Sequence, residues 1–119
     1  YDLSNAAVAA VPGSYQIQKM YMGRDQTDIL QARQTVRDGV NQGDLIVNFV
    51  GHGAIPWWAA EILFSTDDVP NLYNGGKLPV FMEMTCYTGY FHAPSYDSLA
   101  ETLMRRANGG AVADWAASG

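Results

Sequence analysis

The strongest constraint on the fold is a short, almost uniformly apolar run, residues 45–50, that ends in Gly51-His52-Gly53. Runs that do not alternate apolar and polar residues are typical of parallel strands covered on both faces. In sheets built from such strands, ligands bind at the carboxyl edge. A titratable histidine between two glycines at that edge predicts a functional site around His52.

The rest of the chain alternates expected helices and strands. Apolar residues recur at helical spacing over residues 27–40, and Gly43 follows as a stop. The other expected elements are the end of a helix at 3–11, an outer strand at 15–22, a helix start at 65–73, a strand at 78–86, a helix at 98–107 opened by a capping box of Ser98 and Glu101, and a last strand at 111–116. The aromatic segment 54–64 fits either a loop or a short helix.

The long connections between these strands fit right-handed crossovers in a parallel sheet of about four strands. We therefore expect an α/β fold, a three-layer α/β/α sandwich with a mostly parallel sheet. At 119 residues the chain holds one domain, residues 1–119, which we expect to be incomplete because both of its ends look severed.

Composition excludes several classes of function. The net charge is −5 and only seven residues are Lys or Arg, so a nucleic-acid surface is not expected. The apolar stretches are far shorter than the roughly 20 residues of a membrane-spanning helix. The lone cysteine, Cys86, cannot form an internal disulfide, so it is either packing filler or a reactive thiol.

If the strands at 45–50 and 78–86 are parallel neighbours, His52 and Cys86 reach the same edge of the sheet. A Cys and a His placed in this way can act as nucleophile and general acid/base. The N–H groups of Gly53 and Cys86 could bind the oxyanion of an acyl-transfer intermediate. On this pattern alone, a buried structural Cys86 and a His52 that only caps a turn remain the alternatives.

A metal site made by His52, Cys86 and His92 is disfavoured, because zinc usually takes a fourth ligand or close ligand pairs. We expect no metal and no cofactor. Trp57 follows the histidine and Tyr90 follows the cysteine, so both are candidates for substrate contact. Glu83 lies in the strand that leads to Cys86, and we expect this carboxylate to be paired structurally and not catalytic.

The order and spacing of these motifs resemble the gingipain family of cysteine peptidases, which belongs to the caspase-like clan. The resemblance runs from about residue 44 to residue 118 and is carried by the segments 48–53, 78–91, 100–104 and 110–113. It implies a caspase-like fold, of which this chain would supply only part of the sheet.

The same resemblance implies that Cys86 attacks the scissile carbonyl and that His52 protonates the leaving amine, with Gly53 and Cys86 N–H groups as the oxyanion hole. It implies a protein or peptide substrate and an extracellular or cell-surface location. The exposed edges of an incomplete sheet would favour pairing with a second copy. The alternative is a catalytically idle binding or assembly module, which predicts an occluded Cys86 or a distant His52.

Overall fold

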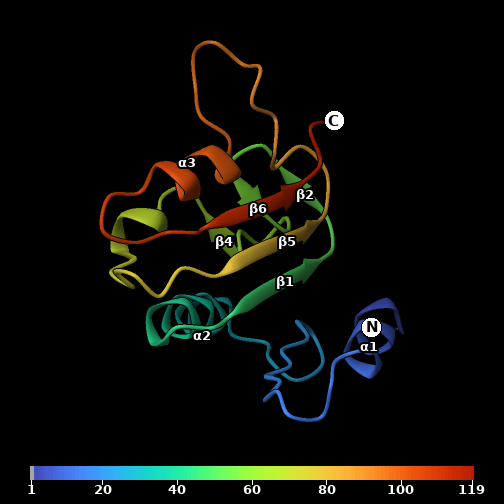
Figure 1. Ribbon diagram of the computed structural model, residues 1–119. Coiled ribbons are helices and arrows are strands. Elements are labelled where there is room, and N and C mark those ends of the chain that lie inside the picture. Colours follow the sequence, from blue (N-terminus) through green and yellow to red (C-terminus); the bar gives the residue numbers. More distant parts are fainter. Residues whose placement is uncertain (1) are drawn as a thin grey trace.

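The computed structural model describes residues 2–119, and its centre is a parallel sheet of three strands (Figure 1). The strand order is β1 (Ile46–Val50), β5 (Val80–Met84) and β6 (Ala113–Ala116). Ile46 lies opposite Val80 and Val50 lies opposite Met84, so β1 and β5 run in register to their carboxyl ends. The expected parallel pairing of the strands at 45–50 and 78–86 is confirmed.

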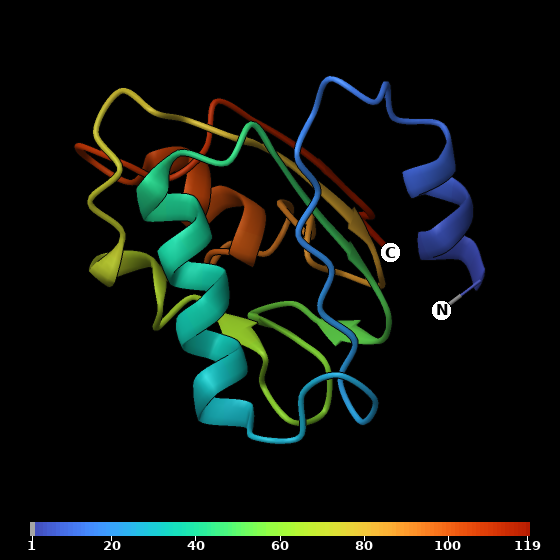
Figure 2. The same ribbon diagram turned by 90° about the horizontal axis from the view of Figure 1, so that it is seen from below.

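One face of this sheet carries the core. Phe81 is fully buried, whereas Ile46, Met84 and Trp115, on the opposite face, are 54%, 44% and 72% exposed. The core cluster is formed by Ala32, Val40, Trp58, Leu63, Phe64, Val69, Leu72, Phe81, Leu99, Leu103 and Ala111. Figure 2 shows α2 (Ile29–Gln42) and α3 (Leu99–Arg105) on one side of the sheet and α1 (Asp2–Ala9) on the other. No residue of α1 is buried, so the second face of the sheet stays largely open.

Local sequence signals determine where α2 and α3 begin and where α2 ends. Asp28 caps α2 by accepting bonds from the N–H groups of Leu30 and Gln31, and Gly43 ends it in the left-handed conformation. Ser98 and Glu101 form the expected capping box at the start of α3. These two helices are confirmed, with bounds shifted by a few residues.

The expected strand at residues 15–22 is wrong. Within residues 2–119 this segment makes one isolated bridge, between Met22 and Gln26, and Tyr15 and Ile17 are 55% and 43% exposed. The segment does not pair with the outer edge of β1, and a strand is stable only when a neighbour takes up its backbone hydrogen bonds. Residue type alone therefore misled the prediction.

The expected helix at 65–73 is reduced to one 3-10 turn, η1 (Val69–Asn71). Asp68 does not cap it, because its carboxylate is buried and accepts bonds from Ser65, Arg33 and Arg37 instead. Asp68, which lies within the expected helix start, thus ties this segment to α2 and to Ser65 and does not cap a helix.

The aromatic segment forms a small antiparallel sheet, which neither alternative for it had included. Its strands are β2 (Gly53–Ala54), β3 (Trp57–Trp58) and β4 (Phe64–Ser65), in that order. Figure 1 places this hairpin behind the parallel sheet, on the side of α3. None of the helices in residues 2–119 is long and apolar enough to cross a membrane.

Candidate active site

His52 and Cys86 occupy equivalent positions beyond two neighbouring strands. Val50 and Met84 are the last residue pair of the β1–β5 ladder, and the Gly51 N–H donates to the Met84 carbonyl oxygen over 3.3 Å. Each candidate residue follows two positions after its strand. The fold therefore brings both to the same edge of the sheet, and both are exposed there.

The backbone of His52 is held by the aromatic hairpin. The Ala59 N–H donates to the His52 carbonyl oxygen over 2.7 Å, and Gly53 pairs with Trp58. Gly53 packs tightly against β5, because a Cβ atom at this position would lie 2.4 Å from Thr85 Oγ1. The glycine after the histidine thus allows the hairpin to approach the strand that leads to Cys86.

The backbone around Cys86 has two features suited to a nucleophile. Tyr87 has a φ of 62°, a left-handed conformation that is uncommon for a large side chain and is found at functional turns. Among the hydrogen bonds within residues 2–119, none uses the Cys86 N–H, so this donor is free to bind a ligand oxygen. The left-handed Tyr87 leaves no mark in the sequence pattern, and only the structure reveals it.

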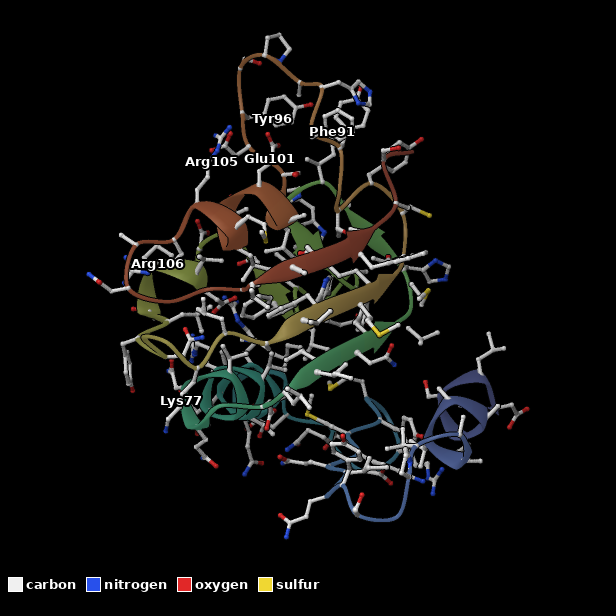
Figure 3. All side chains as sticks on the ribbon, viewed as in Figure 1. Lys77, Phe91, Tyr96, Glu101, Arg105 and Arg106 are labelled. Atoms are coloured by element: carbon white, nitrogen blue, oxygen red, sulfur yellow. The ribbon has the colours of Figure 1, made fainter. Side chains whose placement is uncertain are left out.

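The candidate substrate-contact residues come from the segments that follow His52 and Cys86. Trp57 is 37% exposed on β3, and Tyr90 is half-buried in the loop after Cys86. His92 packs against Tyr90 within this loop, with the two ring centroids 3.8 Å apart. Figure 3 shows Phe91 and Tyr96 on the same long loop, which rises beyond α3, away from the sheet.

Sequence reasoning missed a buried polar cluster behind the corner. Glu83 on β5 is 1% exposed, and its Oε2 accepts a 2.5 Å hydrogen bond from the Trp58 indole N–H. Asp114 on β6 lies within hydrogen-bond reach of Glu83. Burial raises the pKa of Glu83, and burial together with the neighbouring Glu83 raises the pKa of Asp114 to about 9.

A sequence signal for this cluster did exist. Each carboxylate sits in a strand at an inward-facing position, Glu83 two residues after the buried Phe81 and Asp114 just before the exposed Trp115. Pairing them requires the register of β5 and β6, in which Phe81 lies opposite Asp114. Strand register was not available from the pattern.

The arrangement can support covalent acyl transfer. An exposed thiol, an exposed imidazole and an unused backbone N–H lie at one edge, on residues fixed by two parallel strands and a hairpin. Within residues 2–119, His, Cys, Asp and Glu side chains form no group of three or more suited to hold a metal ion.

Comparison with known protein families gives one match that spans the chain. The family model described as peptidase family C25 matches residues 1–119. Two relatives from Porphyromonas gingivalis, gingipain R2 and gingipain R1, are each 35% identical over 72 residues, which is 60% of this chain. Those 72 residues are 10% and 7% of the relatives' own lengths.

Two solved structures share the fold. The Arg-specific cysteine proteinase gingipain R (RgpB) is 33% identical with a TM-score of 0.62, over 69% of this chain and 19% of that one. A complex of the RgpB pro- and mature domains matches with a TM-score of 0.65 and 31% identity, over 72% of this chain and 21% of that one. These matches confirm a caspase-like α/β fold, and this chain spans about a fifth of each matched chain.

Proposed function

The chain belongs to peptidase family C25, and on that premise we propose that Cys86 and His52 are the catalytic pair of a cysteine endopeptidase. The observation that supports the proposal is the register of β1 and β5. Each residue follows two positions after the Val50–Met84 pair, and both are exposed to solvent. An idle module was expected to cover Cys86, and its exposure favours the enzyme.

In the proposed reaction, the Cys86 thiol gives its proton to His52, and the sulfur attacks the scissile carbonyl carbon to form a tetrahedral intermediate. His52 then passes this proton to the amine nitrogen as the C–N bond breaks, which leaves a thioester on Cys86. Water, deprotonated by His52, then attacks the thioester and releases the acid product. The same two side chains serve both halves of the reaction.

The N–H groups of Gly53 and Cys86 are the proposed donors to the oxyanion. Within residues 2–119 the Cys86 N–H has no hydrogen-bond partner, and the tight contact of Gly53 with Thr85 supports the hairpin that presents the first donor. Donors held in place before reaction stabilise developing charge without reorganisation. Trp57, on β3 after His52, and Tyr90, in the loop after Cys86, are the proposed contacts for substrate.

The proposal includes a protein or peptide substrate and an extracellular or cell-surface location, both from the family. Self-association through an open sheet edge is part of it, because residues 2–119 leave the outer edge of β1 without a paired strand.

The test compares peptide cleavage by the full-length protein and its Cys86→Ala and His52→Ala variants, using a diverse peptide library. We expect cleavage to disappear in the first variant and to fall by about 10²- to 10⁴-fold in the second, the usual worth of a general acid/base. An Asp67→Ala variant, which removes an exposed carboxylate outside the site, serves as control. Equal cleavage by the parent and Cys86→Ala would refute the proposal.

A further inference from the structure

Two carboxylates lie diagonally across β5 and β6 on the core side of the sheet, and no cationic side chain of residues 2–119 forms an ion pair with either. Glu83 and Asp114 point to the core side from the neighbouring strands β5 and β6. Glu83 Oε1 and both carboxylate oxygens of Asp114 are buried and receive no hydrogen bond from residues 2–119. Two ionised carboxylates so placed would repel each other in a weakly solvated environment.

A single shared proton resolves this arrangement. Glu83 already accepts the Trp58 indole N–H, a bond that favours its ionised form. Asp114 is then the protonated partner and donates its O–H to Glu83, which accounts for the absence of any other donor to the pair. Burial and Glu83 raise the pKa of Asp114 to about 9, consistent with that assignment.

The other groups around the pair are identified by packing. The Thr88 hydroxyl is fully buried and, within residues 2–119, makes no hydrogen bond. Glu101 and Arg105 of α3 line the groove that opens beside Asp114, and the two residues form an ion pair of 3.7 Å. Arg105 also pairs with Asp97, so its charge is already shared between two carboxylates.

Glu83 connects the two halves of the candidate site. It lies three residues before Cys86, and it holds Trp58, whose ring is 2% exposed and stacks on Phe49 at 4.6 Å. Trp58 pairs with Gly53, and the next residue, Ala59, holds the His52 carbonyl. One side-chain hydrogen bond therefore spans from the strand of the cysteine to the hairpin of the histidine.

We propose that Glu83 is a positioning residue for His52, acting through Trp58, and that a proton shared with Asp114 keeps its carboxylate in place. The inference rests on the proposed function for its kinetic consequence. Its structural part, the Glu83–Trp58 bond and the shared proton, stands independently of activity.

The kinetic test uses the full-length protein and the variants Glu83→Gln, Trp58→Phe and Asp114→Asn. Loss of the Glu83–Trp58 hydrogen bond in Glu83→Gln and in Trp58→Phe is expected to lower kcat by about 10- to 100-fold with KM unchanged. A displacement of a catalytic group by about 1 Å can have an effect of this size. Trp58→Phe keeps an aromatic ring against Phe49 and removes the indole donor, so it replaces Glu83→Gln if that variant fails to fold. Glu61→Gln, which alters an exposed carboxylate of the same hairpin, is the matched control.

Asp114→Asn separates the shared proton from a purely structural role. Its amide N–H₂ still donates to Glu83 and cannot ionise, so we expect near-parental kcat at neutral pH. Above about pH 9, where the parent loses the shared proton, this variant is expected to retain a larger fraction of its activity. Parallel alkaline profiles in parent and variant would overturn the shared proton.

A spectroscopic test distinguishes failure of this inference from failure of the proposed function. The Trp58 indole N–H resonance of the parent is expected to lie downfield, to exchange slowly, and to shift in Glu83→Gln but not in Glu61→Gln. That result supports the Glu83–Trp58 hydrogen bond even if no peptide is cleaved. An unchanged indole resonance together with an unchanged kcat in Glu83→Gln would overturn it.

Discussion

The left-handed Tyr87 and the close-packed Gly53 are the residues where the backbone itself is specialised for the site. A non-glycine residue in the left-handed region costs about 1 kcal/mol of stability. Tyr87, directly after Cys86, adopts this conformation. Gly53 leaves no room for a side chain against Thr85. Tyr87 lowers stability, and Gly53 restricts the residue type, at the point where the chain turns at the sheet edge.

The Gly53→Ala variant tests this at the residue scale. Its Cβ would lie 2.4 Å from Thr85 Oγ1, so the hairpin or β5 must move. We expect a loss of about 1–3 kcal/mol in unfolding free energy, typical of overpacking, together with a lower kcat. Chemical denaturation and peptide cleavage provide the two measurements.

Gly76→Ala is the control, because a Cβ there meets nothing within 4 Å. If Gly53→Ala matched this control in both stability and activity, the tight approach of the hairpin would be of no consequence.

At the scale of elements, the buried carboxylate of Asp68 ties α2 to the segment before η1. It is 1% exposed and pairs with Arg33 at 3.0 Å and Arg37 at 2.8 Å, while also accepting the Ser65 N–H. The two arginines are about a quarter exposed, which screens part of the attraction.

We expect Asp68→Ala to destabilise the fold by about 2–4 kcal/mol, because it leaves two cations and a buried N–H without their acceptor. Asp67→Ala, one residue earlier and exposed, should change stability by less than about 0.5 kcal/mol. Urea midpoints of the two variants decide the matter. Similar midpoints would show that the cluster contributes little.

The elements predicted from sequence are those whose signals are local. The capping box of Ser98 and Glu101, the stop at Gly43 and the apolar run of β1 each determined their structure within a few residues. From the β1 and β5 runs alone, the meeting of His52 and Cys86 at one edge was predicted.

The errors lie where distant partners decide. Residues 15–22 have strand-like composition but no strand beside them in residues 2–119. The two-residue strands of the aromatic hairpin are too short to show alternation, and they depend on Trp58 packing against Phe49. Asp68 binds arginines of α2 and does not cap a helix. The proximity of Glu83 and Asp114 could be predicted only with the register of β5 and β6.

For the whole molecule, the acid pair makes stability depend on pH. The pKa of Asp114 rises from 3.8 to about 9 on folding, so between these values the folded protein holds a proton that the unfolded chain has lost. The unfolding free energy must therefore fall as pH rises through this window. Glu83, whose pKa is raised by burial, adds to the same trend.

We expect Asp114→Asn to flatten this decline and Glu61→Gln to leave it unchanged. The measurement is the urea midpoint across the window for the parent and both variants. A parent and Asp114→Asn with parallel pH dependence would show that Asp114 ionises freely in the folded state.

The central claim is that the corner of β1 and β5 makes Cys86 a nucleophile assisted by His52. The most direct test treats the full-length protein with a library of peptidyl acyloxymethyl ketones and locates the adduct by mass spectrometry. We predict covalent labelling at Cys86, abolished by prior unfolding and slowed by about 10²-fold or more in His52→Ala. Labelling at an equal rate in folded, unfolded and His52→Ala protein, or none at Cys86, would contradict the claim.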